Sequence, residues 1–386
     1  MQSLIYLDSN ATTQVAPEAV AAMLPFFEKV YGNPSSLHAK GMEVAKHVEH
    51  ARDQVGNLLG CQSEELVFTG CGSESNALAI RGVADLLPPT RRHLVTTAVE
   101  HSAVKSNLEF LTKHGFTLSV LGVDRDGMIS LDELEQVVSD RTGLVSIMYA
   151  NNETGVIFPI EQIGTIVKAK GAVFHVDAVQ AVGKIPIALT HSTIDLLSLA
   201  GHKFHAPKGV GALFVRKGVA LQPQLLGGHQ EHGRRAGTEA VPSLIALGMA
   251  AELAQHNLPA MDTQVRARRD RFEHWVLGNI ADTRVNGDRQ ARLPNTSNIS
   301  FRNLEGENIL LALSTIGICV SAGAACMSGS LEPSRVLKEM QVPHDYILGA
   351  IRFSLSRYTT DEEISQTLAK LPVACEKLRK ISRSSP

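Results

Sequence analysis

Hydrophobic positions follow two different periods along roughly the first 215 residues. Short runs that are almost wholly apolar recur there, as expected for strands buried on both faces of a sheet. These runs are Leu66–Thr69, His93–Thr97, Thr117–Leu121, Leu144–Tyr149, Ala172–Val176, Leu196–Leu199 and Ala212–Val215. Stretches with a helical period separate many of them, over Ser75–Leu87, Ser102–His114 and Pro159–Lys170. This alternation predicts an α/β fold with a mainly parallel sheet and helices on both faces.

The pattern changes in the last third of the chain. Two long helices are predicted over Ala240–Gln255 and Thr263–Asn279, with a break at the Leu-Pro pair 258–259 between them. The remaining predicted elements are strands near Asn298–Arg302 and Ala350–Leu355 and a helix over about Asp361–Arg379. This mixture is typical of an α+β domain.

The length fits two domains, because 386 residues exceed the size of an average single domain. We expect a large domain over residues 15–256, and a smaller α+β domain made of residues 1–14 and 257–386. The hydrophobic content of 44% is enough for sizeable cores. The formal charge of −2 gives no reason to expect nucleic acid or an anionic membrane as a partner.

Cysteine usage and the absence of targeting signals favour a cytoplasmic protein. The five cysteines are Cys61, Cys71, Cys319, Cys326 and Cys375, and none forms a C-x-x-C pair. An odd, scattered set argues against a disulfide framework and a cysteine zinc site. The chain shows neither a signal-peptide pattern nor an apolar run of about 18 residues that could span a membrane.

Groups suited to one cofactor follow several predicted strands. Lys203 comes after an apolar strand, where burial favours an uncharged amine that can react with an aldehyde. Asp177 ends another strand and can keep a pyridine nitrogen protonated, and Gln180 can reach the phenolic oxygen of the same ring. Taken singly, Lys203 is better explained as a surface lysine on a loop, and Asp177 is equally well explained as a helix N-cap.

Three further strand ends carry compatible groups. Gly72 and Ser73 lie between a strand and a helix, where backbone amides and a hydroxyl can bind phosphate. His101 can stack on a cofactor ring and transfer protons, and Asn152 can hydrogen-bond a ring substituent. Parallel strands of one sheet bring their carboxyl ends to one edge, so these groups together predict a site for pyridoxal phosphate.

A small-residue segment carries the remaining candidate. Cys326 lies within Ser321–Ser330, which contains little that a core could bury, and we expect this loop (about residues 321–332) to be mobile. An accessible cysteine is reactive when its thiolate is favoured. Cys319 lies in an apolar run and is expected to be buried and inert.

The ordered set of motifs resembles the NifS/IscS-type cysteine desulfurases, within the class V aminotransferase group of fold-type I pyridoxal-phosphate enzymes. The motifs are Tyr6–Thr13, Tyr31–Ser36, Gly72–Ser75, Glu100-His101, Asn151–Gly155, His175–Gln180, Gly201–Lys203, Arg235–Thr238, Ala325–Ser334 and Ile351-Arg352. They run in order over nearly the whole chain, which makes the resemblance far more specific than any one motif.

The resemblance implies a role for each residue. Lys203 binds pyridoxal phosphate covalently, Asp177 pairs with its pyridinium nitrogen, and His101 stacks on the ring. The residues implied to hold the ring-oxygen side are Asn152 and Gln180, and those implied to bind phosphate are Gly72, Ser73, His202 and, from the partner subunit of a homodimer, Thr238. The residues implied to bind the L-cysteine substrate are Arg352, Asn33 and Asn152. Cys326 is the implied persulfide carrier, and L-alanine is the second product.

The resemblance also implies a partner, an iron–sulfur scaffold protein that accepts the sulfur. It leaves open whether Cys326 transiently ligates an iron–sulfur cluster shared with that scaffold. The segments Phe204–Lys208 and Gly233–Gly237 favour the nitrogen-fixation branch over the housekeeping branch. Ala200 departs from the family, since many relatives have a serine or threonine there, and we expect one phosphate hydrogen bond fewer.

Three alternatives stay open from the sequence. A selenocysteine lyase or another class V pyridoxal-phosphate enzyme would keep Lys203 but would not need Cys326. A metal-binding protein could use the histidines of His202-x-x-His205 and His229-x-x-His232. A sulfur carrier acting through Cys326 alone would leave Lys203 and Asp177 unexplained.

Overall fold

The structure of the protein is a computed structural model that describes residues 4–322 and 333–384. In the larger part of the molecule, seven strands form one sheet in the order β2-β8-β7-β6-β5-β3-β4. Their bounds are β2 (Leu66–Thr69), β3 (His93–Thr97), β4 (Thr117–Leu121), β5 (Thr142–Met148), β6 (Val173–Asp177), β7 (Leu196–Ala200) and β8 (Gly211–Val215). Of these seven strands, β8 alone runs in the direction opposite to the others, which confirms the predicted α/β class and the mainly parallel sheet.

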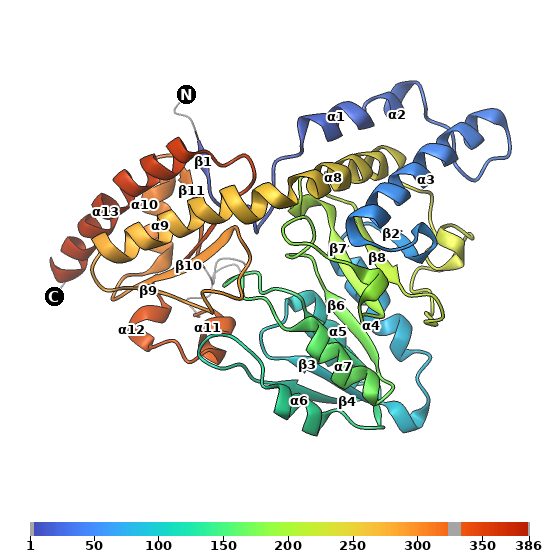
Figure 1. The fold of residues 1–386 in the computed structure, drawn as a ribbon, viewed down its shortest axis with the longest axis horizontal. Helices are drawn as coiled ribbons and strands as arrows, with labels where there is room; N and C mark the ends of the chain where they lie inside the picture. Colours follow the sequence, from blue (N-terminus) through green and yellow to red (C-terminus); the bar gives the residue numbers. More distant parts are fainter. Residues whose placement is uncertain (1–3, 323–332, 385–386) are drawn as a thin grey trace.

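Successive side chains of these strands point to opposite faces of the sheet, and both faces are buried. Val67 and Leu94 pack in a hydrophobic cluster with α4 and α5, whereas their neighbours Phe68 and Val95 pack in a second cluster with α3, α7 and α8. The helices of the large part, visible in Figure 1, are α1 (Pro17–Met23), α2 (Pro25–Glu28), α3 (Ala39–Leu59), α4 (Gly72–Ala84), α5 (Ser102–Thr112), α6 (Leu131–Val137), α7 (Ile160–Ala169) and α8 (Val241–Ala260).

The smaller part of the molecule has its own hydrophobic core. Ile5 and Leu7 from the start of the chain pack there with Phe272, Phe353 and Leu371. Its strands are β1 (Ile5–Tyr6), β9 (Thr283–Val285), β10 (Thr296–Phe301), β11 (Ile318–Cys319), β12 (Ser321–Ala322) and β13 (Ala350–Ser354). Its helices are α9 (Arg266–Asn279), α10 (Gly306–Thr315), α11 (Arg335–Glu339), α12 (His344–Ile347) and α13 (Asp361–Ser384). The domain bounds, 15–256 for the large domain and 1–14 with 257–386 for the small one, stay a prediction.

The predicted helix break at 258–259 is wrong. Pro259 lies inside α8, and the chain continues through a π-helical turn, Met261–Val265, directly into α9. Proline removes one backbone hydrogen bond, and a wider π turn beside it can absorb the local misfit. Met261 and Val265 are buried in the core of the smaller part, so tertiary packing holds the chain helical across the proline.

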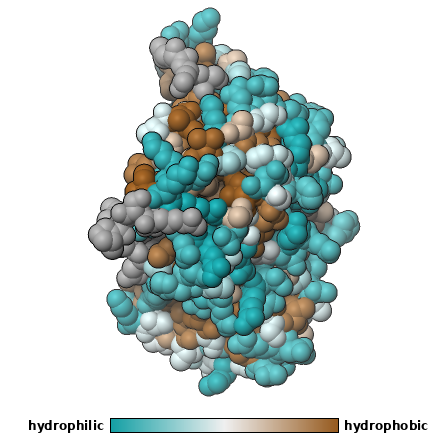
Figure 2. Space-filling view, turned by 90° about the vertical axis from the view of Figure 1, so that its left-hand side faces the viewer, coloured by the Kyte–Doolittle hydropathy of each residue, from teal (hydrophilic) through white to brown (hydrophobic). Residues whose placement is uncertain are grey.

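The face shown in Figure 2 is largely hydrophilic, with hydrophobic residues in several smaller groups. Among the described residues, no helix is both long and apolar enough to cross a membrane.

Candidate active site

A cavity of about 340 Å³ opens where the carboxyl ends of the parallel strands meet the start of the chain. Its volume is in the range of small-molecule sites. Of the residues expected at the site, the ones that line it are Gly72, Ser73, His101, Asn152, Asp177, Gln180, His202, Lys203 and Arg352. The structure therefore brings nine predicted residues to one cavity.

Lys203 lies in a short 3₁₀ turn, Gly201–Lys203, directly after β7. Its Nζ donates hydrogen bonds to the backbone carbonyl oxygens of Asn10 at 2.7 Å and Ala11 at 2.8 Å. The amine thus lies between the large sheet and the N-terminal segment, within reach of a ligand in the cavity.

Asp177 is a buried carboxylate at the end of β6, only 6% exposed. Its Oδ2 accepts a hydrogen bond from Asn76 Nδ2 at 2.8 Å, and its Oδ1 accepts one from the Val179 amide at 3.0 Å. Burial raises the pKa of Asp177, while the two hydrogen bonds and the nearby His101 and Lys203 oppose that rise. A cationic ring nitrogen at this point would find a carboxylate already oriented by donors.

The N-terminus of α4 faces the same cavity, and no side chain caps it. The helix begins at Gly72, three residues before the predicted start, so its first amides are available to an anion. His202 lies nearby, and its Nδ1 is 3.1 Å from the Thr12 hydroxyl. Burial, followed by the charges of Lys203 and Lys208, lowers the pKa of His202 to about 4.

His101 lies at the N-cap of α5, where its Nδ1 accepts a hydrogen bond from the Ala103 amide at 3.1 Å. That bond places the ring proton on Nε2. Desolvation lowers the pKa of His101, and the charge of Asp177 opposes that shift. The preceding residue, Glu100, is buried, and its Oε1 accepts bonds from the Thr97 hydroxyl and the Met148 amide. Burial raises the pKa of Glu100 to about 8.

Arg352 reaches the cavity from β13 of the smaller part. Its Nη2 donates to Asp8 Oδ1 at 2.8 Å, and its Nη1 donates to the Asn152 carbonyl oxygen at 2.9 Å. Its Nε is buried and has no partner among the described residues. A guanidinium has five N–H groups, so donors remain for a substrate carboxylate.

Two predicted site residues, Asn33 and Thr238, do not line this cavity. Asn33 and Thr238 are both exposed, and Asn33 Oδ1 accepts a hydrogen bond from the Ser35 amide at 2.9 Å. Cys326 and most of the predicted 321–332 loop lie outside the described residues. Directly after that segment, Ser334 donates to Glu153 Oε2 at 2.5 Å, and Arg335 donates to the Glu100 carbonyl oxygen. The chain that follows Cys326 is therefore attached beside Asn152 and His101.

The four described cysteines are free thiols. Burial raises the pKa of Cys61 and of Cys375 to about 12, so both stay protonated at neutral pH. Cys319 is half-buried rather than buried, because it lies on the short pair β1-β11, and desolvation raises the pKa of its thiol. Cys71 is exposed and lines the cavity.

Asn10 is the main residue that sequence reasoning missed. Its side chain donates to Thr296 Oγ1 at 2.9 Å, and its Oδ1 accepts from Lys184 Nζ at 2.8 Å and from Asn295 Nδ2 at 3.0 Å. It connects the cavity to residues nearly 300 positions away in the sequence. The only signal was its place inside the Tyr6–Thr13 motif, to which no role was given.

The metal-binding alternative finds no support in the described residues, which contain no cluster of three or more histidine, cysteine or acidic side chains able to hold an ion. His202 and His205 make other contacts, with the Thr12 hydroxyl and the Gln14 carbonyl oxygen.

Comparison with known proteins shows which protein family the chain resembles. The model of the Aminotransferase class-V family matches residues 5–367. Cysteine desulfurase 2 of Trichormus variabilis is 55% identical over 380 residues, which cover 98% of this chain and 95% of that protein. Cysteine desulfurase NifS of Azotobacter vinelandii is 48% identical over 379 residues, which cover 98% of this chain and 94% of that protein. A solved NifS-like protein superposes with a TM-score of 0.92 at 37% identity, covering 97% of this chain and 100% of the other.

Proposed function

The chain belongs to the class V aminotransferase family and is a pyridoxal-phosphate-dependent cysteine desulfurase, and we propose that Lys203 and Cys326 carry its chemistry. The observation that supports Lys203 is the meeting of five strand ends around one amine. Asp177, His101, Asn152 and the N-terminus of α4 all line the cavity that contains it.

The donor set fits pyridoxal phosphate. A dianionic phosphate suits the uncapped N-terminus of α4 with Ser73 and His202, and a pyridinium suits the buried carboxylate of Asp177. Lys203 would hold the aldehyde carbon, and the His101 ring would lie against the cofactor ring. When bound, pyridoxal phosphate supplies an electron-withdrawing ring that stabilises negative charge at the substrate's α-carbon.

Each step of the reaction is then assigned to a residue of this chain. Arg352 binds the α-carboxylate of L-cysteine, and Asn152 orients the substrate. The Lys203 amine removes the α-proton, because it is the basic group that reaches the cavity beside the N-terminal segment. The thiolate of Cys326 attacks the substrate sulfur, an S–S bond forms, and the carbon–sulfur bond breaks with its electron pair returning to carbon. Alanine leaves after protonation, and Cys326 carries the persulfide.

The sulfur acceptor we infer is an iron–sulfur scaffold protein, as for an enzyme of the NifS type. Asn33 and Thr238 are exposed in one chain, and we infer that Thr238 completes the phosphate site of a second subunit. Exposed apolar side chains near the same end of the molecule, Phe27 at 60% and Tyr31 at 71%, are available for such a homodimer. The four free thiols support a reducing, cytoplasmic location.

The decisive experiment asks which cysteine receives sulfur. After addition of L-cysteine under non-reducing conditions, peptide mass spectrometry should find one added sulfur atom on Cys326. The matched controls are Cys71→Ala, in the cavity, and Cys375→Ala, in the core, which should keep the modification on Cys326. If Cys326→Ala released alanine at the full wild-type rate, the persulfide step would be wrong and a selenocysteine-lyase type of reaction would be favoured.

A further inference from the structure

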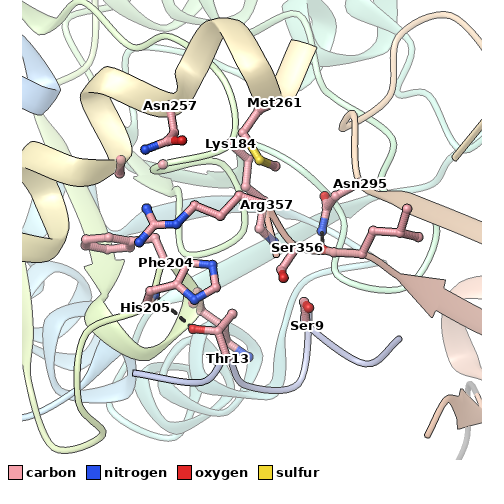
Figure 3. A pocket seen from close by; sticks show the side chains of 14 residues that line it. Ser9, Thr13, Lys184, Phe204, His205, Asn257, Met261, Asn295, Ser356 and Arg357 are labelled. Atoms are coloured by element: carbon pink, nitrogen blue, oxygen red, sulfur yellow. Dashed lines mark hydrogen bonds between the residues drawn. The ribbon is translucent and has the colours of Figure 1, made fainter. Parts of the chain in front are cut away.

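A second lysine lies behind the cavity, and the proposed reaction does not use it. Lys184 is 4% exposed and follows a tight turn at Gly183, whose φ is +75°. A side chain at Gly183 would come within 2.6 Å of Phe204 Cβ, so the turn holds Lys184 close to the segment of Lys203. Figure 3 shows Lys184 beside Asn257, Asn295 and Arg357 around a cavity of about 20 Å³.

The surroundings of Lys184 disfavour its charged form. Within residues 4–322 and 333–384, the charged and titratable groups around it are basic: Lys203, Arg352, His202, His205 and Arg357. Its two hydrogen-bond acceptors are neutral amide oxygens, Gln180 Oε1 at 2.6 Å and Asn10 Oδ1 at 2.8 Å. Burial, and then the charges of Lys203 and Arg352, hold the pKa of Lys184 well below its ordinary value. An uncharged amine has two N–H groups, which match these two acceptors.

The bond to Gln180 decides which end of its amide faces the cavity. Because Oε1 accepts from Lys184, the Nε2 end must point the other way, where it donates to the Asn10 carbonyl oxygen at 3.0 Å. One N–H of Gln180 is then left for the cavity that this side chain lines. The same Asn10 carbonyl oxygen accepts the bond from Lys203. A reversed amide would place its Oε1 against the Asn10 carbonyl oxygen and lose that hydrogen bond, which is unfavourable in a buried site.

We propose that Lys184 is a positioning residue, which orients the Gln180 amide so that an N–H meets the ring oxygen of the cofactor and which holds Asn10 against Lys203. This role rests on the proposed function, since it assumes that pyridoxal phosphate binds in the cavity. It adds a residue that acts through Gln180 and Asn10 and does not touch the substrate.

The first test follows the pH titration of the cofactor's visible absorbance in the full-length holoenzyme. A donor to the ring oxygen favours its anionic form, so losing that donor should raise the apparent pKa of the chromophore, by roughly one unit. Lys184→Met, Gln180→Leu and the double variant are compared, with Lys113→Met as the surface control. The double variant should shift by less than the sum of the two single shifts, because Lys184 acts on the ring oxygen through Gln180. Additive shifts would overturn the proposal.

The second test does not depend on the chromophore. Between its lowered pKa in the folded state and about 10.4 in the unfolded chain, Lys184 binds a proton only after unfolding. The wild type should therefore gain stability over Lys184→Met as pH rises from 7 to 10, by up to tenfold in the unfolding constant per pH unit. Urea unfolding at fixed protein concentration measures this, and a pH-independent difference would contradict an uncharged Lys184.

A further variant, Lys184→Gln, keeps the proposal testable if Lys184→Met does not fold. Lys184→Gln is neutral at every pH but keeps an N–H donor, so it should lose the same pH slope and shift the chromophore less than Lys184→Met. A larger chromophore shift in Lys184→Gln would count against the donor role. A colourless wild-type protein, by contrast, would refute the proposed function itself and leave the stability test standing.

Discussion

The floor and the roof of the active-site cavity are built in different ways. We call floor the groups at the ends of β2, β3, β5, β6 and β7, all within one sheet, and roof the segment 8–13 together with Arg352 from the smaller part. Floor residues are placed by strand ends and short-range bonds, such as Asp177 with the Val179 amide. Roof residues are held by bonds between distant segments, such as Arg352 with Asp8, 344 positions apart.

The floor residues are therefore expected to matter for the reaction, and the roof residues for substrate binding and for the contact between the two parts of the molecule. Changes in the floor should remove the reaction while the fold persists, because the sheet forms without those side chains. Changes in the roof should alter substrate binding and the contact between the two parts of the molecule. The predictions below test this separation.

The largest effect is expected for Lys203 in the floor. Lys203→Ala should lower kcat by about 10⁴-fold or more, since it removes the base and the covalent attachment of the cofactor together. Alanine formation from L-cysteine and the visible absorbance measure this loss. Lys113→Ala, an exposed lysine on the far end of α5, is the control. Lost activity in a variant that still folds fits the floor model, whereas covalent attachment of the cofactor to Lys203→Ala after borohydride reduction would contradict it.

The roof residue Arg352 should act mainly on substrate binding. Arg352→Gln removes a buried cation bonded to Asp8 and Asn152, and we expect kcat/KM to fall by roughly 10²–10³-fold, mostly through KM. Asp8→Asn leaves the guanidinium in place and should cost much less. Steady-state kinetics with L-cysteine distinguish the two variants, and a loss confined to kcat would show that Arg352 belongs to the chemistry instead.

Asn10 tests the contact between floor and roof. Asn10→Ala leaves Lys184 and Asn295 without a shared acceptor, so we expect a loss of about 2–3 kcal/mol in the free energy of unfolding. Asn257→Ala is a matched control, because the Asn257 side chain donates within its own helix, to the Leu253 carbonyl oxygen. Equal losses of unfolding free energy in the two variants would mean that the Asn10 bonds contribute no more to stability than a bond within one helix.

The effect that is smallest per step of the measurement concerns pH and Glu100. Its folded-state pKa of about 8 exceeds the ordinary carboxyl value of 4.5, so between these pH values the folded chain holds a proton that the unfolded chain releases. Stability should therefore fall as pH rises from 4.5 to 8, by at most about 1.4 kcal/mol per pH unit. Glu100→Gln should lack this part of the slope. Thermal melting of both proteins at pH 5 and pH 8 checks it, and parallel curves would rule it out.

Most of the floor residues could be predicted from the sequence, because the end of a strand depends mainly on residues that are close in the chain. All seven predicted strands of the large sheet are present, with bounds that differ by at most two residues, and polar residues after five of them line one cavity. A run of apolar residues decides where a strand lies, and parallel pairing then decides which ends meet. The motifs over nearly the whole chain also determined the family.

The tertiary structure alone decided the rest. The helix continues through Pro259 because both parts of the molecule bury its flanks, and no local pattern reveals that packing. Likewise Asn10 acquires its contacts with Lys184 and Asn295 only when segments 174 and 285 positions apart in the sequence come together. Hydrogen bonds and burial between distant segments depend on the whole fold, whereas a strand and the residue that follows it depend mainly on their neighbours in sequence.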